Sequence, residues 1–386
     1  MDYKALDKQY VMNTYARNDL VLNSGKGSTS YDLEGNSYID FTSGIGVNSL
    51  GFCNEKWVEA VCKQANTMQH ISNLYYTTPN IELAAKLCQK TGYKRVFFGN
   101  SGAEANEGAI KIAREYARVK YNGERDTILT LVNSFHGRTV TTLAATGQKV
   151  FHEKFLPLTT GFDYITANDI EDLKAKVNEH TAAIMIEIVQ GEGGVIALNQ
   201  DFVTAIDQIC KEKDIVFVVD EVQTGVGRTG TFLACEQFGV KPDVVSLAKG
   251  LGGGLPIGAV LVDDKLDILT YGDHGSTFGG NPISCAGANV VIDALTPEFL
   301  DEVKQKGIKI REYLKDCSEI NSITGLGMMV GIELKTKKAA DVKNECMANG
   351  LLVLTAKTKV RLLPPLNISD EELEKGLEIL KKVLEK

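Results

Sequence analysis

The chain has 386 residues, 44% of them hydrophobic, and 50 acidic against 42 basic residues give it a net charge of −8. This is enough apolar sequence for one large core and a second, smaller one, and the acidic balance excludes the basic surface typical of nucleic-acid binding. The first residues lack the apolar core of a signal peptide, and no apolar run is long enough to span a bilayer.

Eight cysteines are scattered along the chain, without a C-x-x-C pair and without the spacing of metal ligands. Scattered reduced thiols are typical of proteins in a reducing compartment. We therefore expect a cytoplasmic protein with no metal site and no membrane contact.

The first ninety residues mix strands and helices. Residues 28–41 predict two short strands around a turn at 34–36, and helical patterning follows at 57–69 and 81–89. From residue 94, short apolar runs alternate with helical segments. The predicted strands of this part are 95–98, 127–132, 183–188, 215–219, 244–247 and 259–262, and its clearest helices are 103–120 and 202–213.

The last hundred residues predict a second α/β region. It has a helix at 299–314, strands at 328–334, 351–355 and 360–363, and a final helix whose capping box pairs Ser369 with Glu372. Short apolar strands separated by helices indicate a mostly parallel sheet covered on both faces. We expect a large domain at 51–285 and a smaller one made from 1–50 and 286–386.

Ligands of such sheets bind beyond the carboxyl ends of the strands. After the strand ending at Phe98, a short turn leads through Ser101 and Gly102 into the helix that includes Ala103. The free N–H groups and the dipole of a helix N-terminus form a phosphate site. The alternative is an ordinary N-cap by Asn100 or Ser101.

Two further strand ends carry charged side chains. The run 215–219 ends in Asp220 and Glu221, and the strand 244–247 is followed by Lys249 and a glycine-rich loop. Capping and surface solvation are the ordinary roles of these residue types. A phosphate cradle, a carboxylate and a lysine on successive strand ends nevertheless match pyridoxal phosphate, which needs a Schiff-base lysine and a carboxylate beside its pyridine nitrogen.

Residues 225–230 (GVGRTG) match the dinucleotide-binding pattern G-x-G-x-x-G, so an NAD-dependent dehydrogenase is the alternative of a different class. The first glycine lies five residues beyond Asp220, too far for the tight first turn. Only a short helix fits before Gly239, and Asp243 precedes the next strand rather than ending it. These features disfavour a dehydrogenase.

Eight motifs follow one another along nearly the whole chain: SNLYY (72–76), NSGAEANE (100–107), SFHGRT (134–139), QGEGG (190–194), DEVQTG (220–225), KG (249–250), GSTFGGNP (275–282) and RLLPPL (361–366). In these motifs the chain resembles the class-III, or ornithine-type, pyridoxal-phosphate aminotransferases, and the resemblance implies fold type I with a mostly parallel seven-stranded sheet. Two departures from the family pattern are residues 50–55 (LGFCNE) and Ile188, which follows Glu187 where the family usually has proline.

The resemblance implies roles for these residues. Lys249 would bond the cofactor and move the proton, and Asp220 would pair with the pyridine nitrogen. Substrate carboxylates would meet Arg138 and Arg361, with Glu192 as a switch beside an arginine. The implied cofactor contacts are Ser101, Gly102, Ala103, Phe135, Asp220, Glu221, Val222, Gln223 and Lys249, with Ser276 for substrate and Thr277 for phosphate contributed by the neighbouring subunit of a homodimer.

The family implies transfer of an amino group to 2-oxoglutarate. Ornithine-specific members carry a tyrosine where this chain has Gly44 and Ile45, which leaves room for an acyl group and favours N2-acetyl-L-ornithine, hence arginine biosynthesis. N-succinylornithine, N-succinyl-diaminopimelate, ornithine and 4-aminobutyrate remain open as donors. An aminomutase of the same fold and a catalytically silent binding protein are the two remaining alternatives to an aminotransferase.

Overall fold

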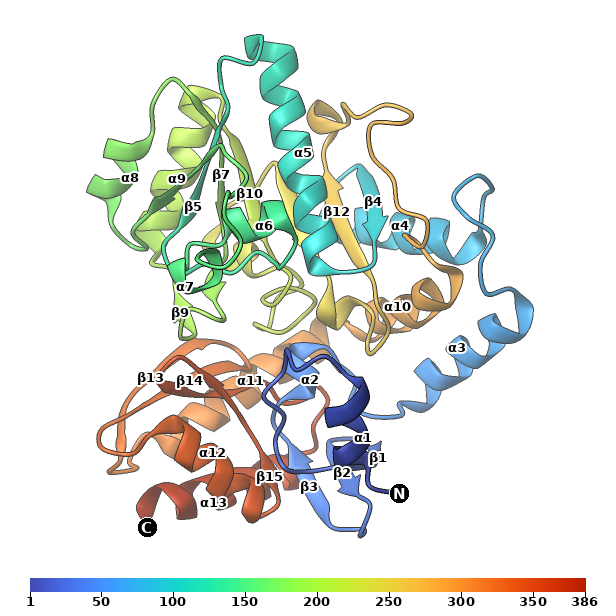
Figure 1. The fold of residues 1–386 in the computed structure, drawn as a ribbon, viewed down its shortest axis with the longest axis vertical. Helices are drawn as coiled ribbons and strands as arrows, with labels where there is room; N and C mark the ends of the chain where they lie inside the picture. Colours follow the sequence, from blue (N-terminus) through green and yellow to red (C-terminus); the bar gives the residue numbers. More distant parts are fainter.

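The computed structural model describes residues 1–386, which form two lobes (Figure 1). The strands of the larger lobe are β4 (Arg95–Gly99), β5 (Thr127–Leu131), β6 (Phe162–Ile165), β7 (Thr181–Ile186), β10 (Val216–Asp220), β11 (Val244–Leu247) and β12 (Gly258–Val262). They form one sheet in the order β4-β12-β11-β10-β7-β5-β6, in which only β12 runs against its neighbours. The predicted seven-stranded, mostly parallel sheet is confirmed.

Helices cover both faces of this sheet because its strands are apolar on both sides. Along β10, Val216 and Val218 face the core under α5, whereas Phe217 and Val219 face the core that includes Phe202 of α9. The helices of this lobe are α3 (Glu55–Thr67), α4 (Thr78–Thr91), α5 (Gly102–Tyr121), α6 (Val140–Ala145), α7 (Lys149–His152), α8 (Ile170–Lys176), α9 (Gln200–Lys213) and α10 (Pro282–Ala294).

The smaller lobe joins both ends of the chain, and both termini lie in it (Figure 1). Its first sheet contains β1 (Leu22–Lys26), β2 (Thr29–Asp32), β3 (Ser37–Asp40) and β15 (Leu351–Leu352), with β15 parallel to β3. Its second sheet contains β13 (Ile320–Leu326), β14 (Met329–Leu334), β16 (Leu354–Ala356) and β17 (Lys359–Leu362). Its helices are α2 (Ser43–Gly46), α11 (Pro297–Leu314), α12 (Ala339–Ala348) and α13 (Asp370–Glu385).

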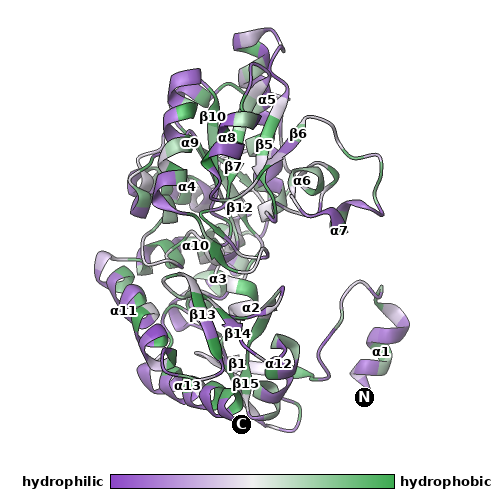
Figure 2. Ribbon diagram, turned by 90° about the vertical axis from the view of Figure 1, so that its left-hand side faces the viewer, coloured by the Kyte–Doolittle hydropathy of each residue, from purple (hydrophilic) through white to green (hydrophobic).

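The division of the chain at 50/51 and 285/286 stays a prediction. The second boundary falls inside α10, which packs against α3 and α4. The predicted cap of the last helix is present, since the Ser369 hydroxyl accepts from the Glu372 N–H at 3.1 Å. Helix α1 (Tyr3–Tyr10) has no buried residue and projects from the smaller lobe (Figure 2).

Short elements connect these layers. They are the ribbon of β8 (Val189–Gln190) with β9 (Ile196–Ala197) and the 3₁₀ turns η1 (Ala234–Phe238), η2 (Lys249–Leu251) and η3 (Asp264–Leu266). No single helix has both the length and the apolar character to cross a membrane. By length and composition alone one bent pair does, α10 with α11, whose axes meet at 78°.

Within the smaller lobe, helix α13 packs closely against Phe41 at a glycine, Gly376. A Cβ atom at Gly376 would lie 2.3 Å from Cζ of Phe41, which is fully buried. We expect Gly376→Ala to lower the free energy of unfolding by about 1–3 kcal/mol, because the clash outweighs the better helix propensity of alanine. Thermal unfolding measures this, with Lys375→Ala on the exposed side of the same helix as control; an unchanged melting temperature for Gly376→Ala would contradict the packing.

Candidate active site

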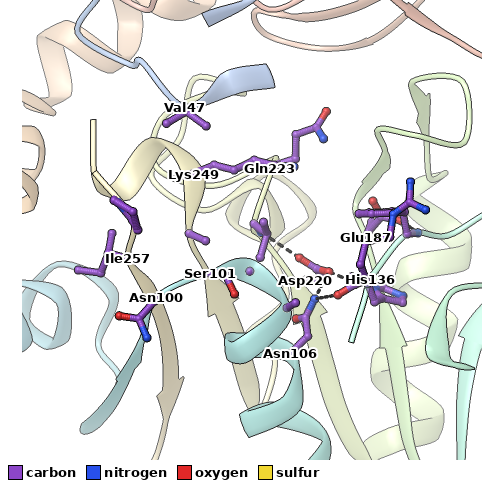
Figure 3. Close-up of a pocket in the computed structure, with 18 of the residues that line it drawn as sticks. Val47, Asn100, Ser101, Asn106, His136, Glu187, Asp220, Gln223, Lys249 and Ile257 are labelled. Carbon is purple, nitrogen blue, oxygen red and sulfur yellow. Dashed lines mark hydrogen bonds and ion pairs between the residues drawn. The ribbon is translucent and has the colours of Figure 1, made fainter. Parts of the chain in front are cut away.

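A cavity of about 430 Å³ lies at the carboxyl ends of the sheet strands and reaches Val47 of the smaller lobe (Figure 3). Its walls come from segments far apart in the sequence: the start of α5, the loop after β5, and the ends of β7, β10 and β11. The predicted site residues that line it are Ser101, Gly102, Ala103, Phe135, Arg138, Asp220, Val222, Gln223 and Lys249.

One end of the cavity is the N-terminus of α5. The Ser101 hydroxyl accepts from the Glu104 N–H at 3.2 Å and so caps the helix. The N–H groups of Gly102 and Ala103 have no partner within the helix and remain available to an anion. A Cβ at Gly102 would lie 2.6 Å from Cγ1 of Val222, so a larger residue would push two walls of the cavity apart. The cap and the anion site therefore coexist.

The carboxylate of Asp220, 3% exposed at the end of β10, is held by three donors. Its Oδ1 accepts from the Val222 N–H at 2.9 Å. Its Oδ2 lies 2.7 Å from Nδ2 of Asn106 and 2.8 Å from Nδ1 of His136 (Figure 3). Ser246 in turn donates to the amide oxygen of Asn106 at 2.6 Å, which orients that amide.

His136 also lines the cavity, although the sequence analysis gave this residue no role. It is 2% exposed and contacts Asp220 through Nδ1, while its Nε2 has no hydrogen-bond partner. Burial by itself lowers the pKa of His136, but the hydrogen bond and the charge of Asp220 outweigh burial and raise it. The imidazole therefore supports the negative charge of Asp220.

Glu187 is a second carboxyl group in the cavity that sequence reasoning did not select. It follows β7 directly beside Asp220, since Ile186 pairs with Val219 in neighbouring parallel strands. Its Oε2 accepts from the Phe135 N–H at 2.9 Å and so fixes the backbone of that aromatic wall. Burial, with the charge of Asp220, raises the pKa of Glu187. The available signal was a carboxyl group within the apolar run 183–188, which the sequence analysis assigned to the strand and the structure places just after it.

Lys249 follows β11 and faces Asp220 across the cavity (Figure 3). Its backbone has a φ of +44°, a conformation that is rare outside glycine and typical of functional sites. Burial lowers the pKa of Lys249, an effect that the charges of Glu192 and Asp220 oppose. A lowered pKa favours the neutral, nucleophilic amine.

Arg138 lines the cavity, and a second arginine, Arg361, lies next to the lining residue Gln223. Arg361 of β17 is 3% exposed, and its Nη1 lies 2.6 Å from Oε1 of Glu192 and 3.4 Å from Oε1 of Gln223. Burial alone raises the pKa of Glu192, but the charge of Arg361 lowers it. Arg138 is exposed and lies over the rings of Phe135 and Phe151, at 5.4 Å and 4.2 Å from their centroids.

Five expected residues do not line this cavity: Arg361 and Glu192, which pair with each other next to Gln223, and Glu221, Ser276 and Thr277. Glu221 is fully buried and accepts from Thr224 at 2.5 Å and from the Cys235 N–H at 2.8 Å, so its carboxylate is held outside the cavity, and its expected cofactor contact stays a prediction. Ser276 accepts from Nδ2 of Asn100 behind the start of α5, and Thr277 lines a different hollow. Within one subunit, neither touches the site.

The chain was compared with known proteins. Residues 11–384 match the family model of the class-III aminotransferases. The chain belongs to this family, so the predicted class of enzyme, its fold type and its pyridoxal-phosphate cofactor are confirmed.

Several relatives are similar to this chain in sequence or in structure over nearly their full length. The chain is 54% identical to the acetylornithine aminotransferase of Haemophilus ducreyi, over 99% of this chain and 98% of the relative. It is 46% identical to that of Methanocaldococcus jannaschii, over 98% and 96%. Among solved structures, the ornithine aminotransferase of Toxoplasma gondii ME49 has a TM-score of 0.95 at 33% identity, covering 99% of this chain and 94% of that one. The N-acetylornithine aminotransferase of Stenotrophomonas maltophilia K279a has 0.85 at 34%, covering 98% and 97%.

The residues present fit pyridoxal phosphate. The unpaired N–H groups at the start of α5 suit its phosphate, and the carboxylate of Asp220, an acceptor held in place by three donors, suits a protonated ring nitrogen. Lys249 stands opposite with an amine that burial biases toward the neutral form.

The lowered pKa of Lys249 has a consequence for cofactor uptake. Because the neutral amine reacts, the rate at which the cofactor-free protein gains the yellow band should rise with pH through a midpoint below about 10.4, the ordinary value of lysine. Stopped-flow absorbance measures the rate, with Nα-acetyllysine as the exposed reference and Lys249→Ala as blank. A midpoint at or above that of Nα-acetyllysine would contradict the effect of burial.

Proposed function

We propose that this chain moves the terminal amino group of N2-acetyl-L-ornithine to 2-oxoglutarate and so forms N-acetyl-L-glutamate 5-semialdehyde and L-glutamate, a step of arginine biosynthesis. The observation that carries the choice of donor is the 54% identity, over nearly the full length of both chains, with a relative named acetylornithine aminotransferase. The cavity, with Lys249 opposite Asp220, supports the chemistry.

Bound pyridoxal phosphate supplies an aldehyde carbon that bonds amines and a ring that accepts electrons when a proton leaves. Lys249 would hold the cofactor through Nζ, and its free amine would move the proton from the carbon that bears the amino group. Asp220 would keep a proton on the ring nitrogen, because its Oδ2 is buried and itself held by His136 and Asn106.

Substrate carboxylates are recognised by guanidinium groups, whose planar fork matches a carboxylate. Arg138 stacks on two aromatic rings and has no carboxylate partner in the chain, so its free edge suits the α-carboxylate. The pair of Arg361 with Glu192 suits a switch: Glu192 neutralises the arginine when the donor presents an uncharged end, and moves away when the second carboxylate of 2-oxoglutarate arrives.

The active assembly is proposed to be a homodimer with shared sites. Thr277 and Ser276 border a hollow lined by residues 72–74, beside exposed apolar side chains. Such a patch on the surface of one subunit is typical of an interface. These side chains are Leu74 (87% exposed), Tyr75, Tyr76 (96%) and Phe278. A cytoplasmic location also stays a proposal, supported by eight cysteines that are all free.

The donor is tested by titrating the holoenzyme spectrum, without acceptor, with N2-acetylornithine, N-succinylornithine, ornithine and 4-aminobutyrate. We expect acetylornithine to bleach the yellow band at the lowest concentration and Lys249→Ala to show no turnover.

Ile45, 43% exposed in the turn before Val47, should admit the acyl end. Ile45→Tyr is therefore expected to weaken acetylornithine at least tenfold relative to ornithine. A stronger response to another amine in the unmodified protein would move the assignment to that donor.

Shared sites are tested by complementation. Lys249→Ala lacks the reactive amine, and Thr277→Glu would place a negative charge where the partner's cofactor phosphate is proposed to bind. Each variant alone should be inactive. Refolded as a mixture, they should recover about a quarter of normal activity, because half the dimers are hybrids with one intact site of two. No recovery, with hybrids confirmed by a tag, would show that Thr277 does not act across an interface.

A further inference from the structure

The glycine-rich run 225–230, whose spacing resembles a dinucleotide motif, forms a joint between the two lobes. No helix begins there; the chain passes through turns between β10 and η1. Gly227 and Gly230 have φ of +88° and +94°, and a Cβ at Gly227 would meet Leu295, Leu300 and Leu366. The glycines thus let the loop that follows Asp220 pack closely against the smaller lobe.

Arg228 extends from this joint into the smaller lobe and is 2% exposed. Its Nη1 donates to the carbonyl of Pro364, three residues after Arg361, and contacts the Met328 carbonyl at 3.5 Å. Its own carbonyl accepts from the Met328 N–H at 3.1 Å. A single side chain of the larger lobe therefore holds two segments of the smaller one.

A third segment is coupled to Arg228 by charge. Burial lowers the pKa of the Arg228 guanidinium, and the charge of the Asp40 carboxylate, 1% exposed, opposes this shift. Burial in turn raises the pKa of Asp40, and the charge of Arg228 opposes that shift. Asp40 accepts from Thr42 and from the Ser43 N–H, and so holds the start of a turn at 43–46 in which every residue has a positive φ. That turn leads to Val47 in the cavity wall.

The same turn is tied to the arginine strand. The Ser43 hydroxyl donates to the Leu363 carbonyl at 2.5 Å, and the Leu363 N–H donates to Phe41 at 2.8 Å. Arg361, the residues that follow it and the turn at 43–46 thus form one connected unit, and the Pro364 carbonyl held by Arg228 belongs to this unit.

Stability of the fold alone does not explain a buried guanidinium at position 228. Burial lowers the pKa of Arg228 to about 9, although Asp40 opposes the shift, and Nη2 is buried without a hydrogen-bond partner. A buried, incompletely paired cation costs free energy that an apolar side chain of similar volume would not. Its side chain does, however, hold the carbonyl of Pro364, in the segment that directly follows Arg361.

We propose that Arg228 is a positioning residue, which sets Arg361 and the turn at 43–46 at the correct distance from the cofactor end of the site. The proposal rests on the proposed role of Arg361 in binding the second carboxylate of the acceptor. A displacement of that guanidinium by a fraction of an ångström to an ångström weakens carboxylate binding, while the proposed cofactor contacts, none of which lies in the smaller lobe, stay unchanged.

The test uses the holoenzyme of Arg228→Met and Arg228→Lys, with glutarate as a dicarboxylate probe in calorimetry. We expect glutarate to bind about tenfold or more weakly and KM for 2-oxoglutarate to rise more than kcat falls. The cofactor absorption should stay unchanged, and the melting temperature of Arg228→Met should stay within a few degrees.

Arg311 provides a matched control. It is also a partly buried arginine that donates to a carbonyl of the same hairpin, at Gly327, and has an unpartnered Nη2, but it touches neither Pro364 nor Asp40. Arg311→Met should therefore leave glutarate binding unchanged. Equal losses for Arg311→Met and Arg228→Met would show that Arg228 only supports folding and would overturn the proposal.

A double variant that also carries Arg361→Lys distinguishes the positioning role of Arg228 from the binding role of Arg361. If Arg228 acts through Arg361, the double variant Arg228→Met/Arg361→Lys should bind glutarate little worse than Arg361→Lys alone, whereas independent effects would multiply. Full additivity, or normal glutarate binding by Arg228→Met, overturns the positioning role. Normal binding by Arg361→Lys alone would instead remove the proposed role of Arg361 itself.

Discussion

A buried carboxylate at the end of the central strand β10 holds the site together. Asp220 receives hydrogen bonds from Asn106 in α5, from His136 in the loop after β5 and from Val222 in its own loop. The helix that offers its N-terminus to phosphate, the loop that carries the aromatic wall and the strand itself are therefore joined at one pair of oxygen atoms. Burial of an isolated carboxylate would cost free energy through lost solvation. Three hydrogen-bond donors offset that cost and fix the orientation of the carboxylate.

The two lobes contribute different functions to the cavity. The groups proposed to hold the cofactor lie in the larger lobe, whereas β17 carries Arg361 and the turn at 43–46 leads to the wall at Val47. Charged groups of the two lobes meet where Glu192, from the larger lobe, pairs with Arg361. Because Arg361 contacts Gln223 and both charges influence Lys249, the groups proposed for substrate selection and for proton transfer share one electrostatic environment.

The run 225–230 shows why a literal motif needs its structural context. Its glycines meet the spacing of a dinucleotide fingerprint, yet they serve close packing between lobes, and the arginine among them reaches the carbonyl of Pro364. A phosphate-binding glycine loop requires a strand, a tight turn and a helix N-terminus in succession. Here that combination occurs instead at residues 99–103, where β4 leads into α5.

By itself, the sequence determined the fold class, every strand of the central sheet except β6 and the positions of Lys249, Asp220 and the start of α5, because hydrophobic periodicity and strand ends are local patterns. It did not predict α10, whose nearly all-round burial leaves no polar face to mark its period. The partners of Asp220 lie 84 and 114 residues away in the chain, and Glu187 joins them only through the pairing of β7 with β10. Likewise, only the packed lobes turned Glu221 inward, kept Thr277 out of its own cavity and placed Arg228 behind Arg361. Such contacts follow from which strands lie side by side and how two lobes meet, and no local pattern of residues records that.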